Sequence, residues 1–174
     1  MFEEIYKHQS IGEFRDIIRY NDGRVKITPW KRNTIVDDIG KLVACFMKGQ
    51  SGYGGIGYWV VGSGLDAWDD VTPPSPTTGD HGVLTEIGRK QIAPSNMSFI
   101  DANGNITTSI TNRILIDLTF GNSECNGKWR EFSIMGGNAT ATVGTGLAVN
   151  HKTHGLIVKT DQMQIERQIR FTFR

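Results

Sequence analysis

An alternation of apolar and polar residues at the C-terminal end of the sequence is the feature that most constrains the fold. The apolar positions are Met163, Ile165, Ile169, Phe171 and Phe173, and the polar positions are Gln164, Glu166, Gln168, Arg170 and Thr172. A period of two places the apolar side chains on one face of a β-strand, which must be buried against another layer. The sequence therefore predicts a sheet with one covered face, into which the C-terminal end is tied.

Similar patterns recur along most of the chain. Strands are predicted over residues 13–20, 25–27, 56–61, 91–100, 106–120 and 129–135. Asn21-Asp22-Gly23 and Asn103-Gly104 separate neighbouring strands, and both supply the positive φ angles of tight hairpin turns. The predicted fold is mainly β, an antiparallel β-sandwich with one packed amphipathic α-helix and a long loop.

The helix is predicted from about Thr34 to Lys48. Its apolar residues recur at spacings of three and four and form one stripe: Ile35, Val36, Ile39, Leu42, Val43, Phe46 and Met47. Asn33 or Thr34 is a suitable N-terminal cap, and Gly49 follows the last turn, where glycine commonly ends a helix. We expect this helix to lie against a sheet.

The long loop is predicted over residues 63–82. Its candidate interface residues are Trp68, Pro73, Pro74 and Pro76. Loops of this length are often interaction segments, and aromatic residues carry much of the energy of protein interfaces. Two interpretations of Trp68 stay open, because its ring either contacts a partner or fastens the loop to its own domain.

Length and composition predict one folded domain overall. The chain has 174 residues, of which 38% are hydrophobic and 21% charged, values typical of a folded protein and not of a disordered one. We divide the domain into an N-terminal strand or arm, residues 1–32, and a β-sandwich, residues 33–174. The polar composition of the first segment predicts that it reaches toward a partner.

Charge and hydropathy argue against two classes of partner. The net charge is +1, from 19 basic and 18 acidic residues, whereas a nucleic-acid-binding face needs clustered Lys and Arg. No stretch approaches the roughly 18 apolar residues of a membrane span, and the acidic Met1–Glu4 is unlike a signal peptide. We therefore expect no nucleic acid, no membrane, and folding in a cytoplasm.

Two segments resemble binding loops but lack an essential part. Gly121–Lys128 differs from a phosphate-binding loop in the spacing of its glycines, and Trp129 replaces the required Ser or Thr. Asp101–Asn105 begins like a calcium loop, but Ile106 and Asn112 stand where glycine and an acid are needed. We interpret the second segment as a hairpin turn.

Histidines near acidic residues form two further candidate sets. They are His151 and His154 with Asp161, and His81 with Asp80 and Glu86. The first set can be drawn as a metal site, although polar residues in a loop are the favoured interpretation. The second set has no nucleophile placed by sequence. The sequence thus predicts no catalytic, metal or cofactor-binding residues, and a protein that is not an enzyme.

Several segments between residues 33 and 173 resemble, in their order, a group of tailed-bacteriophage structural proteins found around tail fibres and baseplates. They are Ile35–Ala44, Ile56–Gly64, Leu84–Lys90, Trp129–Gly137, Leu147–His154, Ile157–Thr160 and Ile165–Phe173. Ile56–Gly64 ends in the Val-Gly-x-Gly of that group. Leu84–Lys90 is similar to its Leu-Thr-x-Glu-x-x-Arg segment, and Trp129–Gly137 to its Trp-x-Glu-x-Gly strand, with Ser133 in place of the glycine.

The resemblance implies a β-sandwich with one packed helix, self-association and incorporation into a virion, after synthesis and assembly in the cytoplasm of a bacterial host. The expected partners are other virion structural proteins and further copies of the chain, as a trimer or hexamer. Two alternatives stay open. One is a capsid decoration or neck protein. The other is a glycan- or metal-binding module with Trp59, Trp68, His151 and His154 as contacts.

Overall fold

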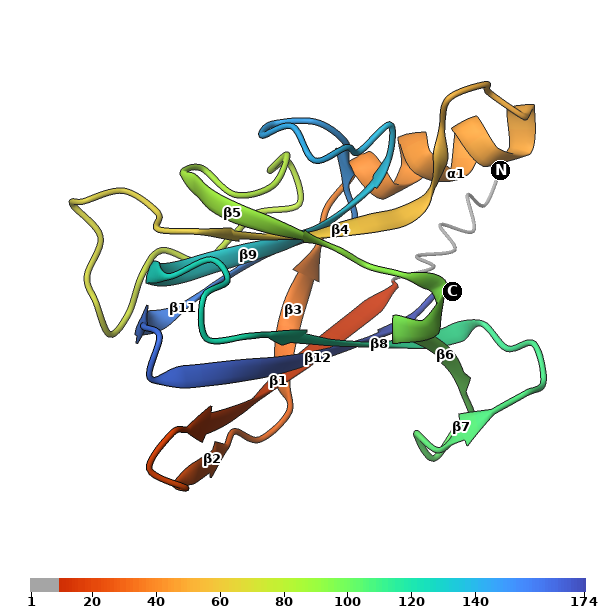
Figure 1. Ribbon diagram of the computed structural model, residues 1–174. Helices are drawn as coiled ribbons and strands as arrows, with labels where there is room; N and C mark the ends of the chain where they lie inside the picture. The colour runs from red at the N-terminus through yellow and green to blue at the C-terminus, as the bar shows by residue number, and fades with distance from the viewer. Residues whose placement is uncertain (1–9) are drawn as a thin grey trace, which may run out of the picture.

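The computed structural model describes residues 10–174. All the strands in this range pair in antiparallel fashion (Figure 1). They are β1 (Ile11–Tyr20), β2 (Val25–Ile27), β3 (Lys31–Ile35), β4 (Gly54–Gly62), β5 (Glu86–Gln91), β6 (Met97–Ile100), β7 (Ile106–Thr107), β8 (Arg113–Phe120), β9 (Gly127–Gly137), β10 (Leu147–Ala148), β11 (Asn150–Lys159) and β12 (Met163–Thr172). The helices are α1 (Asp38–Lys48) and the 3₁₀ helix η1 (Pro94–Asn96).

The strands form two layers that face each other, as Figure 1 shows. One layer has the order β5-β4-β9-β11, and the other has the order β1-β12-β8-β6-β7. Strand β3 pairs with β11 of the first layer and with β1 of the second, so it joins the layers along one side. The predicted antiparallel, mainly β, sandwich-like fold is confirmed.

The main core fills the space between the layers. Its large buried residues are Phe14, Ile18, Trp59, Val61, Ile116, Leu118, Phe120, Trp129, Phe132, Ile134, Ile165, Ile169 and Phe171. Aromatic rings from both layers meet there, and the ring centroids of Phe14 and Phe132 are 5.0 Å apart. The apolar face of β12 lies on this core, as the alternation of apolar and polar residues at the C-terminal end predicted.

The N-terminal segment is part of the sandwich from Ile11 onward. Strand β1 pairs with β12 along its whole length, from Ile11 opposite Thr172 to Tyr20 opposite Met163. Residues 11–27 are therefore a strand and not a separate arm, because β1 supplies inward-facing core residues and β2 pairs with it. That they contact a partner stays a prediction. Residues 1–9 of that predicted segment lie outside the described residues.

Helix α1 begins four residues later than predicted. Thr34 and Ile35 belong to β3, where they pair with His151 and Asn150 of β11, so neither Asn33 nor Thr34 caps the helix. Backbone pairing between the two layers outweighs the helical spacing of the apolar side chains here. No helix within residues 10–174 is long and apolar enough to cross a membrane.

The end of α1 agrees with the prediction, but its apolar face is covered only in part. Gly49 has a φ of 66° and closes the helix through its N–H group. Leu42 is buried, whereas Val43, Phe46 and Met47 are exposed. The helix contacts β9 and β10 at one end of the sandwich.

Two predicted strands are each interrupted. The segment 91–100 contains η1, which begins at Pro94, a residue without the N–H group that a strand ladder needs. The segment 106–120 divides into β7 and β8. The hairpin turn at Asp101–Asn105 is confirmed, because the Asp101 carboxylate accepts hydrogen bonds from the N–H groups of Asn103 and Asn105 at 2.8 and 2.9 Å.

Candidate functional site

The long loop, residues 63–85 between β4 and β5, covers the outer face of β9 and β11 and is three residues longer than predicted. Phe132 and Ile134 face the main core, so the residues between and beside them, Glu131, Ser133 and Met135, face the opposite side of the layer. Met135 belongs to a second, smaller core with Val36, Val60 and Ala148, against which Val83 of the loop packs. The loop is therefore part of the folded structure.

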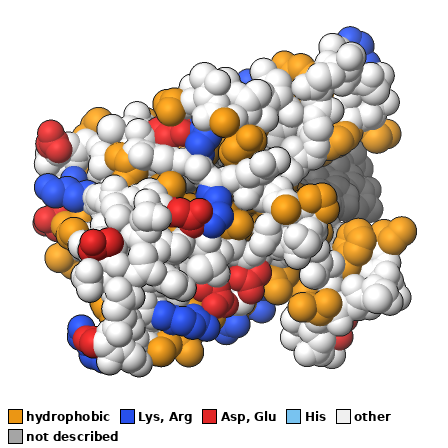
Figure 2. Space-filling view, in the orientation of Figure 1, with side chains coloured by type: hydrophobic (Ala, Val, Ile, Leu, Met, Phe, Trp, Pro, Cys, Tyr) orange, Lys and Arg blue, Asp and Glu red, His pale blue; other side chains and the backbone are white. Residues whose placement is uncertain are grey.

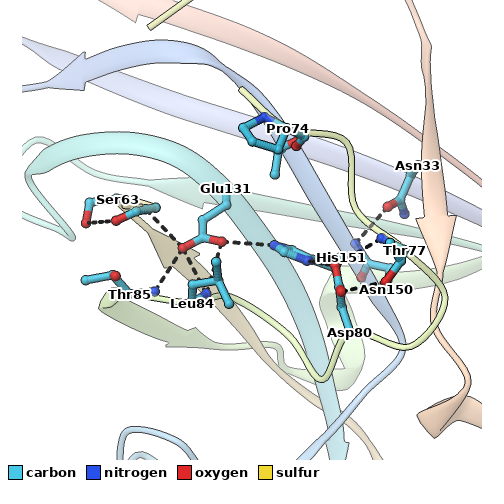
Figure 3. Close-up of polar contacts among 12 residues, drawn as sticks. Asn33, Ser63, Pro74, Thr77, Asp80, Leu84, Thr85, Glu131, Asn150 and His151 are labelled. Atoms are coloured by element: carbon cyan, nitrogen blue, oxygen red, sulfur yellow. Dashed lines mark hydrogen bonds and ion pairs between the residues drawn. The ribbon is translucent and has the colours of Figure 1, made fainter. Parts of the chain in front are cut away.

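Glu131 of β9 holds both ends of the long loop. Its side chain is fully buried, and its Oε1 accepts hydrogen bonds from the N–H groups of Gly64, Leu84 and Thr85, each at 3.0 Å (Figure 3). A β-carbon at Gly62 would lie 2.6 Å from the same oxygen, so only glycine leaves room for this carboxylate. One carboxylate thus fixes where the loop leaves β4 and where it returns to β5.

His151 connects Glu131 to Asp80 in the second half of the loop. Its Nε2 lies 2.9 Å from Glu131 Oε2, and its Nδ1 lies 2.7 Å from Asp80 Oδ2. Asp80 accepts further hydrogen bonds from the hydroxyl and the N–H group of Thr77, at 2.7 and 3.1 Å. Figure 3 shows the Glu131, His151 and Asp80 side chains in succession, joined by dashed lines. We call Glu131, His151 and Asp80 the loop network.

Two further side chains of β11 form hydrogen bonds nearby, Thr153 with the loop and Asn150 with neighbouring strands. The Thr153 hydroxyl donates a hydrogen bond of 2.7 Å to the Pro74 carbonyl oxygen. The Asn150 side chain accepts a hydrogen bond from the Ile134 N–H group at 2.8 Å and donates one to the Asn33 side chain at 3.0 Å. The loop is tied to β9 and β11 at its two ends and at several points between them, which include hydrogen bonds from the Arg130 guanidinium and the Leu156 N–H group to Asp70.

The electrostatics of the loop network favour a charged histidine between two charged carboxylates. Burial disfavours charge on Glu131 and Asp80, but the hydrogen bonds from His151 and from loop N–H groups outweigh burial, so the pKa of each carboxyl lies below its ordinary value. Burial likewise opposes charge on His151, but its hydrogen bonds to Glu131 and Asp80 raise its pKa above 6.5. When His151 is charged, both ring nitrogens donate to carboxylates. The chemistry of this arrangement is that of an ion-paired structural support.

We expect the long loop to be held most firmly between about pH 4.5 and 6.5, the ordinary pKa values of Glu131 and His151. The raised pKa of His151 contributes stability that is complete below 6.5 and is lost as the pH rises through its value in the folded protein. The lowered pKa values of Glu131 and Asp80 contribute stability that is lost as the pH falls through their values in the folded protein. Hydrogen exchange of the Gly64, Leu84 and Thr85 amides, corrected for intrinsic rates, measures this dependence.

The matched control for this pH dependence is His151→Gln, which keeps a hydrogen-bonding side chain but does not titrate. In this variant the protection of the same amides should be weaker below pH 6.5 and should no longer change as the pH rises above that value. Equal protection in the original protein from pH 6 to pH 10 would contradict the assigned role of His151.

The predicted interface residues lie along the loop in different environments. Trp68 is half-buried, and its ring lies so close to Gly64 that a β-carbon there would overlap it. Pro73 and Pro76 are half-buried and Pro74 is exposed. Trp68 therefore packs against the first residues of its own loop, while part of its ring stays accessible. Exposed apolar side chains flank it at Leu65 and Val71.

A second network of charged side chains lies inside the main core. Arg167 of β12 is fully buried, and its guanidinium donates to both carboxylate oxygens of Asp16 on β1, one of them at 2.8 Å. The guanidinium carbon lies 4.6 Å from the centre of the Phe132 ring. Burial and the charge of Arg167 lower the pKa of the neighbouring His154 to about 4. His154 is therefore neutral near pH 7.

The structure separates the residues of each candidate set from the sequence. His151 belongs to the loop network and His154 to the Arg167 network, while Asp161 lies in the turn between β11 and β12. In the second set, His81 pairs with Asp38 at 2.8 Å, Asp80 with His151, and Glu86 with Arg89. Within residues 10–174 there is no group of three or more His, Cys, Asp or Glu side chains arranged to hold a metal ion.

The contacts suggested for a glycan-binding module do not share a surface. The Trp59 side chain is fully buried in the main core, 5.5 Å from the ring centre of Phe132. His151 is buried beneath the long loop, and Trp68 lies in the loop itself. That combination is therefore wrong as a single binding site.

The sequence interpretation missed Glu131 and Arg167, the charged centres of the two networks. Each has a recognisable signal, since Glu131 lies among apolar residues of a buried strand and Arg167 occupies an inward position of β12. A charged residue at such a position is seldom fully buried without a partner. Their respective partners, His151 and Asp16, lie on other strands, and nothing in the sequence pairs them with Glu131 and Arg167.

Comparison of this chain with protein-family models, with curated proteins and with solved structures finds no match.

Proposed function

We propose that this protein is a structural component of a bacteriophage particle, a tail, baseplate or fibre-attachment protein that acts by self-assembly and contacts with other virion proteins. The succession of phage-like segments over residues 33–173 supports the phage context. The mainly β, sandwich-like fold agrees with what that resemblance implies, although many unrelated proteins share such folds.

The long loop is the feature of the structure that most supports a role in protein contacts. The loop network fixes it by buried ion pairs, so its surface is preformed before any partner arrives. It presents Leu65, Val71 and Pro74 as exposed apolar residues beside the partly accessible Trp68. A preformed surface loses less conformational freedom on binding than a mobile one, which favours specific association.

Light scattering behind a sizing column tests self-assembly through the loop. We expect a trimer or hexamer, and we expect Val71→Asp to shift it to smaller species, because Val71 is 78% exposed and its new charge would be buried in the interface. Ile27→Asp is the matched control, since Ile27 is also an exposed β-branched residue but lies on β2, away from the loop. A monomer at high concentration, or equal effects of both substitutions, would contradict assembly through this loop.

Electron microscopy tests the virion role separately. A gold-labelled antibody against the protein should mark the tail or baseplate of phage particles made in cells that carry its gene. Label on the head or neck would support the capsid alternative instead. Particles without label would contradict a structural role in the virion, whatever the oligomeric state of the purified protein.

A further inference from the structure

An apolar groove of about 620 Å³ opens at the end of the sandwich between α1 and strands β6 and β8. Its walls include Leu42, Val43 and Phe46 of α1, Met97 and Phe99 of β6, and Phe173 after β12. Figure 2 shows hydrophobic side chains gathered on this side of the molecule, where Figure 1 has α1 and the β6–β7 hairpin. The groove is distinct from the long loop.

Several apolar side chains at the groove are exposed and have no covering layer among the described residues. Val43 and Phe46 are 53% and 51% exposed, and Met47 beside them is 86% exposed. Single exposed apolar residues are common, but a contiguous apolar concavity usually marks a binding site. The amphipathic spacing of α1 gives the same indication, because its apolar stripe continues beyond Leu42, its one buried apolar residue.

The described part of the chain begins beside this groove. Ile11 pairs with Thr172, so the next residues outward on the two strands are Ser10 and Phe173, and Phe173 lines the groove. Ile39 also lines both the groove and the adjoining hollow that contains Ser10. Nine residues precede Ser10. They can span up to about 30 Å when extended, whereas the 11 residues of α1 are about 16 Å long.

The sequence of those nine residues matches the groove in chemistry. Phe2, Ile5 and Tyr6 recur at spacings of three and four, and Glu3 and Glu4 lie between the first two. The adjoining hollow, which Ser10 also lines, contains Arg32 and Arg174. Apolar side chains therefore have an apolar partner surface, and acidic side chains have basic ones nearby.

We propose that the groove is the binding site of this chain's own N-terminal segment, Met1–Gln9, with Phe2, Ile5 and Tyr6 directed into it. The segment covers Val43 and Phe46, the exposed part of the helix face. This inference goes beyond the proposed virion role and does not depend on it, because it concerns a contact within one chain.

Cross-linking in the full chain tests the proposal. The test variant carries Glu4→Cys and Cys125→Ser and keeps the native thiol of Cys45 on α1. The control carries Glu4→Cys and Lys26→Cys with both native cysteines replaced by serine, since Lys26 is exposed on β2. With a short bis-maleimide, we expect the intramolecular product to form roughly tenfold faster in the test variant, because binding raises the local concentration of the two thiols.

Two further measurements separate the possible outcomes. Adding Phe2→Ser, Ile5→Ser and Tyr6→Ser to the test variant should remove the excess cross-linking, as should Val43→Asp. The same three serine substitutions, in the otherwise native chain, should increase the fluorescence of an apolar dye bound to the folded protein, because the groove becomes open. Equal rates in test and control, unchanged dye binding, or a covalent dimer as the main product would each overturn the proposal, the last because the segment would then bind a second copy.

Discussion

Asp16→Ala should lower the free energy of unfolding by about 3–5 kcal/mol, the range typical of removing one partner of a buried ion pair. The substitution leaves the Arg167 guanidinium without its carboxylate in the main core, where its side chain is fully buried among the rings of Phe14, Trp129 and Phe132. Urea denaturation at neutral pH, with the slope compared between variants, measures the loss.

Two variants show whether the loss comes from the buried charge. Glu13→Ala breaks an ion pair between the same two strands, with Arg170, but on the partly exposed outer face, so it should cost less than about 1 kcal/mol. The double variant Asp16→Ala with Arg167→Met should be more stable than Asp16→Ala alone, because it removes the unpaired charge. If the double variant is no more stable, the buried charge is not the cause.

Glu131→Ala should release the long loop while most of the sandwich stays folded. It removes the acceptor of three loop N–H groups and leaves His151 with Asp80 as its remaining carboxylate partner. We expect the free energy of opening the loop to fall by about 3–5 kcal/mol, since the buried groups lose a charged partner. Thermolysin, which cleaves beside apolar residues such as Leu65, Val71 and Leu84, should then cut within the loop much faster.

The conservative variant Glu131→Gln separates charge from hydrogen bonding. Its amide oxygen still accepts from the loop N–H groups, but it no longer pairs with a charged His151, so its cleavage rate should lie between those of the original protein and Glu131→Ala. Glu124→Ala is the surface control, because Glu124 pairs with Lys90 at the other end of β5 and should leave cleavage of the loop unchanged. Cleavage of Glu131→Ala at the original rate would show that the loop does not depend on this carboxylate.

The elements that the sequence predicted well are those determined by neighbouring residues. The hairpin turns at Asn21–Gly23 and at Asp101–Asn105 follow from local side-chain and backbone preferences, and so does the end of α1 at Gly49. The alternation in β8 and β12 is also local, since it reports only that one face is buried. These signals were sufficient for the fold class.

The errors arose where partners distant in the sequence decide the structure. Thr34 and Ile35 carry a helical pattern but lie in β3, because β3 bridges the layers through pairing with residues more than a hundred positions away. The resemblance to phage proteins likewise identified segments but not the contacts between them. It predicted neither the loop network nor the network around Arg167.

What the amino-acid sequence determined by itself is the two-layered, mainly β architecture, because period-two burial and tight turns are properties of short segments. What only the tertiary structure decided is which charged side chains are buried and what the long loop does. Burying Glu131, His151, Asp16 and Arg167 is favourable only when each finds an opposite charge, and those charges come together only after distant strands have paired. The loop is held in place for that reason.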